Sequence, residues 1–102
     1  MKTITLQIGN TDNKLTQQEW SRFVNSVDNY LNVSMQHYIK IHFSGGSNNS
    51  SPYQNFCWVF EKTNDEIEDY VLDTIKKQIS NYAKEEYKQD SIAWTEGVTE
   101  FV

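Results

Sequence analysis

Residues 55–61, with the sequence NFCWVFE, most restrict how this chain can fold. Large side chains occupy both alternating faces, with Phe56, Trp58 and Phe60 on one and Cys57 and Val59 on the other. A strand that is apolar on both faces is typical of the interior of a sheet. Directly before it, residues 44–54 are rich in Gly, Ser and Asn and predict a long polar hairpin connection.

Two further segments alternate between apolar and polar residues, which is the pattern of a half-buried strand. In residues 3–8 the apolar side chains are Ile4, Leu6 and Ile8. In residues 38–43 the pattern places Ile39, Ile41 and Phe43 on one face, opposite Tyr38, Lys40 and His42. A closing strand is expected within residues 91–102, with Gly97 as a bulge or bend.

Two segments predict amphipathic helices, each opened by a capping box. Thr16 and Glu19 begin the first, whose apolar positions are Trp20, Phe23, Val24, Val27, Tyr30 and Leu31. Thr63 and Glu66 begin the second, which ends near Tyr87 and carries Ile67, Tyr70, Val71, Ile75, Ile79 and Tyr82. Its expected first turn is acidic, with Asp65, Glu66, Glu68 and Asp69, and acidic side chains favour the positive end of a helix dipole.

The order of elements is strand, helix, strand, strand, helix, strand. With right-handed crossovers this predicts an α+β fold, a ferredoxin-like βαββαβ plait with a four-stranded antiparallel sheet in the order 4-1-3-2 and two helices on one face. A length of 102 residues fits a single domain covering 1–102.

In that plait the connections at residues 10–15, 44–55 and 88–90 meet at one end of the sheet. A long connection in a small domain is often functional, and a helix N-terminus attracts anions. We therefore expect a small polar ligand, such as a nucleotide, to bind there; the alternative is that the connections are merely solvated. The expected ligand-binding residues are Asn10, Thr11, Asn13, Lys14, Ser44, Asn48, Tyr53, Gln54, Asn55, Lys88 and Gln89.

Few residues suggest catalysis. His42 and Ser44 form a single H-x-S pair, whereas two-histidine phosphoesterases use two such motifs. Cys57 is better explained as a structural residue, and the two histidines cannot chelate a metal together because they lie on opposite faces of one strand. We expect no metal, no cofactor and no catalytic residues, although Asp12, Asp90 and Glu96 could approach one another near the same end of the sheet.

The face of the sheet that the helices leave open has two possible compositions. If Phe56, Trp58 and Phe60 lie on it, it resembles the aromatic surface of RNA-recognition plaits. If Cys57, Val59 and Glu61 lie on it, the mixed surface suits self-association, and a homo-oligomer is expected.

Charge and cysteine content narrow the function classes. The formal net charge is −5, which argues against nucleic-acid polymers as partners. The one cysteine excludes an intrachain disulfide, and the first ten residues lack the apolar stretch of a signal peptide or membrane span. The expected location is cytoplasmic.

Two stretches, LQIGNTDNKLTQQEWSRF and YKQDSIAWTEGVTEFV, resemble small uncharacterised proteins of bacteriophages and bacteria. The resemblance implies a phage accessory protein that antagonises host defence, acting in the host cytoplasm. The expected function is a small non-catalytic binding module that sequesters a polar ligand such as a nucleotide signal. The alternatives are an acidic inhibitor that binds a host protein, and a phosphoesterase-like enzyme using His42.

Overall fold

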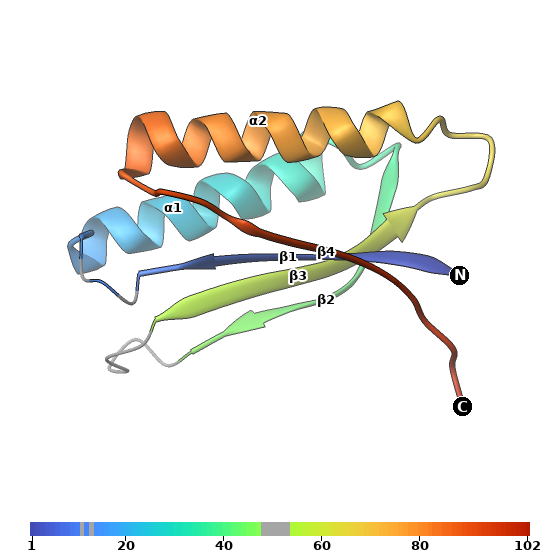
Figure 1. The fold of residues 1–102 in the computed structure, drawn as a ribbon, viewed down its shortest axis with the longest axis horizontal. Helices are drawn as coiled ribbons and strands as arrows, with labels where there is room; N and C mark the ends of the chain where they lie inside the picture. The colour runs from blue at the N-terminus through green and yellow to red at the C-terminus, as the bar shows by residue number, and fades with distance from the viewer. Residues whose placement is uncertain (11, 13, 48–53) are drawn as a thin grey trace.

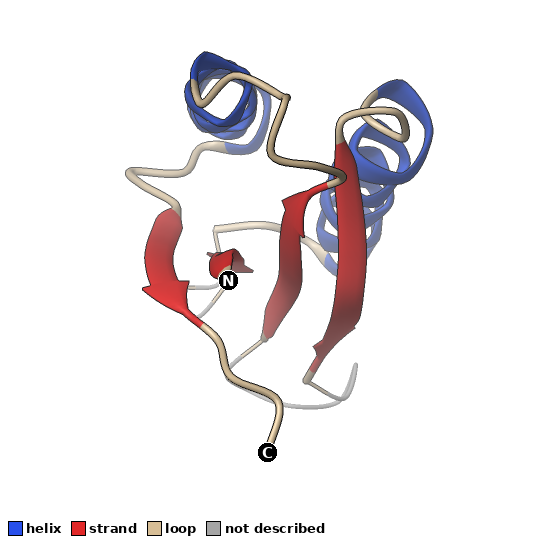
Figure 2. Ribbon diagram, turned by 90° about the vertical axis from the view of Figure 1, so that its right-hand side faces the viewer, coloured by secondary structure: helices blue, strands red, loops and turns tan. Residues whose placement is uncertain are grey.

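The computed structural model describes residues 1–10, 12, 14–47 and 54–102. The elements in chain order are β1 (Lys2–Gly9), α1 (Gln17–Asn29), a π-helical turn η1 (Tyr30–Ser34), β2 (Ile39–Gly46), β3 (Asn55–Lys62), α2 (Tyr70–Tyr87) and β4 (Ala93–Val98). The four strands form one antiparallel sheet in the order β2-β3-β1-β4, which is 4-1-3-2 counted from the other edge. Both helices lie on the same side of this sheet (Figures 1 and 2).

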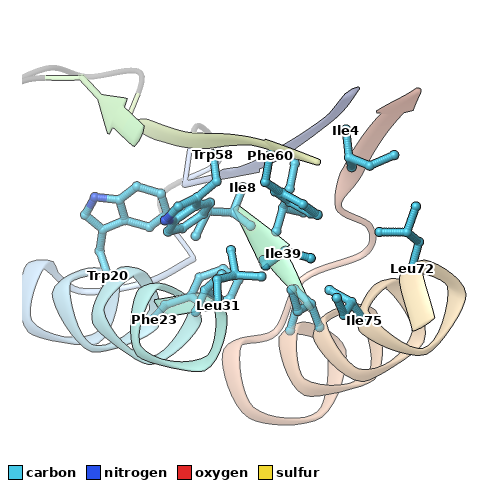
Figure 3. Packing of buried hydrophobic residues seen from close by; sticks show 14 of the residues in the cluster. Ile4, Ile8, Trp20, Phe23, Leu31, Ile39, Trp58, Phe60, Leu72 and Ile75 are labelled. Carbon is cyan, nitrogen blue, oxygen red and sulfur yellow. The ribbon is translucent and has the colours of Figure 1, made fainter. Parts of the chain in front are cut away.

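The core lies between the central strands β3 and β1 and the two helices. Trp58 and Phe60 are fully buried and stand in register with Leu6 and Ile4. Figure 3 shows both aromatic side chains directed toward the helices that carry Phe23 and Ile75. Each of these large side chains contributes roughly 1.5–3 kcal/mol on burial. Because β3 lies between β2 and β1 in the sheet, its predicted central position is confirmed. The buried apolar cluster is Ile4, Leu6, Ile8, Leu15, Trp20, Phe23, Val27, Leu31, Ile39, Trp58, Phe60, Leu72, Ile75, Ile79 and Ala83.

This packing decides between the two predicted compositions of the open face. Because Trp58 and Phe60 face the helices, the alternate residues Cys57, Val59 and Glu61 lie on the other side of β3, where each is half-buried. The open face is therefore the mixed surface. The aromatic surface typical of RNA recognition is absent from this strand.

The start of α1 follows the sequence prediction. The Thr16 hydroxyl accepts a hydrogen bond from the Glu19 backbone N–H at 3.1 Å, and the Glu19 carboxylate accepts one from the Thr16 N–H at 3.0 Å. These bonds favour the ionised carboxylate and lower the pKa of Glu19. Behind this cap Trp20, Phe23 and Val27 are buried. The capping box is confirmed.

The second predicted capping box is wrong, because α2 begins at Tyr70 and not after Thr63. The Thr63 N–H donates to the Tyr38 carbonyl at 2.9 Å, and the Thr63 hydroxyl donates to the His37 carbonyl at 3.0 Å. These two bonds hold Thr63 at the end of β3, beside the residues that precede β2. The Asn64 side chain accepts from the Glu66 N–H at 3.0 Å, a local turn that competes with helix formation.

The late start of α2 changes the role of the acidic residues before it. Asp65, Glu66, Glu68 and Asp69 precede the helix, and the acidic residue in its first turn is Asp73. The prediction of an acidic helix face made of these four side chains is therefore wrong. Asp69 instead accepts a hydrogen bond from the Lys62 ammonium at 2.9 Å, which lowers the pKa of Asp69.

The buried stripe of α2 also differs from the expected one. It consists of Leu72, Ile75, Ile79 and Ala83. Tyr70 and Tyr82, which the periodicity placed in the stripe, are 67% and 38% exposed. Leu72 and Ala83 lie three and four positions from Ile75 and Ile79, so the same helical periodicity also fits the observed buried positions.

A β-bulge in β2 moves Phe43 to the other face of the sheet. Ile41 is opposite Phe60, but Phe43 is opposite Val59, because the register shifts between them. Phe43 is therefore 56% exposed on the open face, and its predicted alignment with Ile39 and Ile41 is wrong. No such shift occurs at Gly97, which is directly opposite Thr3, so the bulge expected there is also wrong.

The last residues cross the open face of the sheet (Figure 2). The Thr99 N–H donates to the Met1 carbonyl at 2.8 Å, and the Thr99 and Thr3 hydroxyls are 2.7 Å apart. Farther along, the Phe101 ring centroid lies 6.0 Å from that of His42 on β2. Thr3 is consequently 7% exposed although it faces the open side.

Gly46 offers a test of the close approach between β2 and β3. A Cβ at Gly46 would overlap the Asn55 carbonyl oxygen and lie 2.7 Å from the Phe56 ring, whereas a Cβ at Gly97 meets nothing within 4 Å. We predict that Gly46→Ala lowers the free energy of unfolding by about 1–3 kcal/mol, measured by urea denaturation. Gly97→Ala is the matched control and should leave it unchanged or slightly raised. Equal effects of the two substitutions would contradict the packing described here.

Candidate functional site

The described residues of the β1–α1, β2–β3 and α2–β4 connections lie at one end of the sheet (Figure 1). Contacts join all three. The Asn10 backbone N–H donates to the Gln54 carbonyl at 2.9 Å, which links the first connection to the second. The Lys14 ammonium donates to the Asp90 carboxylate at 3.1 Å, which links the first to the third. The expected order of strands and helices was the only basis on which the sequence predicted that these segments lie together.

Two buried amides form the base of this end, and we call them the Asn10–Gln54 clamp. Their exposed fractions are 0% and 2%. The Asn10 amide nitrogen donates to Gln54 Oε1 at 3.0 Å and to the Leu15 carbonyl at 3.1 Å, and Asn10 Oδ1 accepts from the Leu15 N–H at 3.0 Å. Both side chains were expected to contact ligand. Their burial and internal hydrogen bonds instead give them a structural role.

Gln17, in the first turn of α1, extends the clamp to the helix. The Gln54 amide nitrogen donates to Gln17 Oε1 at 2.6 Å, and the Gln17 amide nitrogen donates to Gln54 Oε1 at 3.1 Å. Gln54, directly before β3, is thus bonded both to Asn10 after β1 and to α1. Buried polar groups of this kind stabilise one arrangement because breaking a single bond leaves its partner unsatisfied.

Three charged side chains surround the outer part of this end. Lys14 Nζ lies 3.1 Å from Asp90 Oδ2 and 3.5 Å from Asp12 Oδ2. The hydrogen bond to Asp90 and its negative charge raise the pKa of Lys14. Two carboxylates face one ammonium, so the local charge is negative. Of the three acidic residues that the sequence allowed to approach one another, Asp12 and Asp90 lie near Lys14, whereas the Glu96 carboxylate lies 3.6 Å from the Lys2 ammonium.

A cavity of about 370 Å³ opens at this end of the sheet, between the β1–α1 and α2–β4 connections and the adjoining ends of β1, β3 and β4, and we call it the rim cavity. Amides, a hydroxyl and carboxylates provide most of its polar groups. Its lining residues are Gln7, Ile8, Gly9, Asp12, Asn55, Gln89, Asp90, Ser91 and Ala93. Asn55 and Gln89 were among the expected ligand-binding residues. Gln7 and Ser91 were not expected to bind ligand, because nothing in their spacing separates them from other polar residues.

The remaining expected residues lie elsewhere or outside the described part of the chain. Ser44 is in register with Trp58, on the helix-facing side of the sheet, and does not line the rim cavity. Lys88 ends α2 in the left-handed conformation, with φ of 56°, and its charge contributes to the lowered pKa of Glu19. Thr11, Asn13, Asn48 and Tyr53 lie outside the residues that the structure describes.

The H-x-S pair does not form a catalytic pair. His42 Nε2 lies 3.1 Å from Glu61 Oε1 on the open face, whereas Ser44 is in register with Trp58, whose side chain faces the helices. The bulge between Ile41 and Phe43 causes this separation. The two side chains therefore cannot act on one phosphate, and the phosphoesterase alternative loses its geometric basis.

Other site types find little support in the described residues. Within them, no three His, Cys, Asp or Glu side chains are grouped so that they could hold a metal ion. None of the helices in that part of the chain has the length and apolar character needed to cross a membrane. Compared with protein-family models and with curated proteins, the chain shows no match.

The Asn10–Gln54 clamp predicts a stability effect that is large for one polar side chain. Asn10→Ala removes three hydrogen bonds and leaves the buried Leu15 N–H and carbonyl groups without these partners. We expect the free energy of unfolding to fall by at least about 2 kcal/mol, measured by urea denaturation. Lys14→Ala, in the same connection, is the control and should change it little because surface ion pairs are weak. An Asn10→Ala variant as stable as the Lys14→Ala variant would refute the clamp.

Proposed function

We propose that this protein is a small non-catalytic binding module that captures a polar ligand in the rim cavity. One observation carries the proposal. Residues far apart in sequence, from β1, β3 and the β1–α1 and α2–β4 connections, converge on a polar cavity of about 370 Å³, and its lining residues Gly9 and Asn55 adjoin the buried Asn10–Gln54 clamp. Its volume is within the range of small-molecule sites, which combine apolar walls with a few converging polar groups. Preorganisation of a site lowers the entropic cost of binding.

The groups around the cavity suit binding better than catalysis. A nucleophile or general base needs a neighbouring group that activates or orients it. The Asp90 side chain is 90% exposed and pairs with Lys14, and no His or Cys lines the described part of the cavity. Gln7, Gln89 and Ser91 offer neutral amide and hydroxyl groups, which recognise a ligand through hydrogen bonds without chemical change.

The local charge narrows the ligand class. Asp12 and Asp90 together outweigh Lys14, so a free phosphate at the cavity would meet net negative charge. A neutral or cationic ligand with several hydrogen-bond donors fits better. For a nucleotide, the base and sugar would occupy the cavity and the phosphates would remain outside. A nucleoside-like ligand is thus the form of the nucleotide hypothesis that the charges favour.

We further propose that the architecture is a ferredoxin-like plait. The antiparallel strand order β2-β3-β1-β4 and the position of both helices on one face support this proposal. A ligand held in the rim cavity, where the described lining has no activated nucleophile or base, would be sequestered without turnover. That is the behaviour expected of an accessory protein that removes a host signal.

Thermal denaturation with a ligand panel tests the proposed function. The panel contains nucleosides, nucleotides, cyclic nucleotides and polyamines. A ligand at 100 times its Kd should raise the free energy of unfolding by roughly 2.7 kcal/mol. We expect nucleosides to stabilise the protein more than the corresponding nucleotides do, and we expect the cationic polyamines to stabilise it as well. Failure of every ligand in the panel to shift the melting temperature would contradict the proposal.

Substitutions of residues that line the rim cavity test whether the stabilising ligand binds there. Ser91→Trp fills the cavity and should abolish the ligand-induced shift, and Gln7→Ala should reduce it. The control is Gln36→Ala, an exposed glutamine in the turn before β2, which should leave the shift unchanged. A shift that survives Ser91→Trp would place binding elsewhere on the molecule.

A further inference from the structure

The two edges of the sheet differ in how well they are protected against pairing with another strand. At the β2 edge, a bulge between Ile41 and Phe43 interrupts the register, and Lys40 and His42 add polar side chains. At the β4 edge, the register with β1 is continuous from Ala93 to Val98, and Glu96 is the one charged residue in that strand. Regular, weakly charged edges are the ones that accept a further strand.

The backbone of β4 presents its unused hydrogen-bonding groups in a defined pattern. The Thr99 N–H donates to the Met1 carbonyl, one step beyond the pair formed by Val98 and Lys2. In an antiparallel ladder, hydrogen-bonded pairs alternate with non-hydrogen-bonded pairs. Thr95 and Gly97 therefore direct their N–H and carbonyl groups toward β1. Trp94, Glu96 and Val98 direct theirs away from the sheet.

We infer that this edge binds the same edge of a second copy of the chain, with the two β4 strands antiparallel across a twofold axis. The outward groups of Trp94, Glu96 and Val98 would then complete hydrogen bonds between the copies. The inference is independent of the proposed ligand function.

A residue on the twofold axis lies opposite the same residue of the second copy. The axis must therefore be placed so that residues whose backbone groups point away from the sheet lie opposite one another. An axis through Glu96 would place two carboxylates directly opposite, which is unfavourable. With the axis through Gly97, the first half of β4 would lie opposite residues that follow β4 in the second copy, so the two strands would pair over only part of their length. An axis through Thr95 pairs residues 92–98 of one copy with 98–92 of the other, and it sets Trp94 opposite Glu96 of the second copy.

Charge complementarity supports a second copy over an unrelated strand. Trp94 and Glu96 lie on the helix-facing side, since their partners on β1 are the buried Leu6 and Ile4. Lys76 Nζ lies 5.6 Å from the centre of the Trp94 ring. Glu96 of the second copy, opposite Trp94, would therefore come beside Lys76, and the twofold axis repeats this contact. The Glu96 and Lys76 side chains are 42% and 41% exposed, so both are accessible.

Cysteine cross-linking tests the pairing and its register. In a Cys57→Ser background, Thr95→Cys should form a disulfide-linked dimer on mild oxidation, because a non-hydrogen-bonded pair on the axis has its Cα atoms about 4.5 Å apart, within disulfide range. Gly97→Cys is the matched control and should remain monomeric on a non-reducing gel, since Gly97 would face Ala93 of the second copy. Cross-linking of Gly97→Cys alone would overturn the register, and cross-linking of neither variant would overturn the inference.

Charge exchange tests the proposed contact between copies. Sedimentation of the wild type should show a concentration-dependent dimer. Glu96→Lys or Lys76→Glu should weaken it about tenfold, and the double variant should restore it. Circular dichroism melts confirm that each variant is folded. A wild type that stays monomeric at millimolar concentration would mean that another chain occupies this edge, and single variants that dimerise like the wild type would place the interface elsewhere. Either result overturns the inference.

Discussion

The burial of Trp58 and Phe60 on β3 determines how the strands and the helices pack against each other. Both side chains are fully buried beneath the helices, and β3 is paired with β1 on one side and β2 on the other. A strand this apolar cannot lie at an edge without exposing its backbone and side chains to solvent. Because β3 is central, Gln54 at its start lies beside the first turn of α1 and beside Asn10. The described residues of the three connections therefore lie at the same end of the sheet.

Convergence alone does not make a site, because hairpin ends are commonly solvated. The buried amides of Asn10 and Gln54 distinguish this end of the molecule. They join two connections through direct hydrogen bonds, and Gln17 adds the helix. These hydrogen bonds hold Gln54 against Asn10 and α1, while the charged side chains of Asp12, Lys14 and Asp90 nearby are exposed.

Much of the fold could be predicted from local patterns, and the errors have identifiable physical causes. The central strand β3 and the cap of α1 depend on residues within a few positions of one another. The start of α2 depends on Thr63 bonding to residues 37 and 38, which no local pattern records. The bulge that turns Phe43 outward is likewise set by pairing with β3. At the site, sequence reasoning treated Asn10 and Gln54 as surface residues because polarity does not reveal burial.

The proposed ligand site is the rim cavity. Amide chemical-shift mapping by NMR, during titration with a nucleoside or polyamine that stabilises the protein, tests this proposal. We expect the largest shifts on Gly9, Asn55, Gln89 and Ser91, with little change in residues 63–69 at the opposite end of the sheet. Shifts concentrated in residues 63–69 would contradict it, as would shifts in a second cavity of about 280 Å³, which Val27 of α1, Tyr30 of η1 and Tyr82 of α2 help to line.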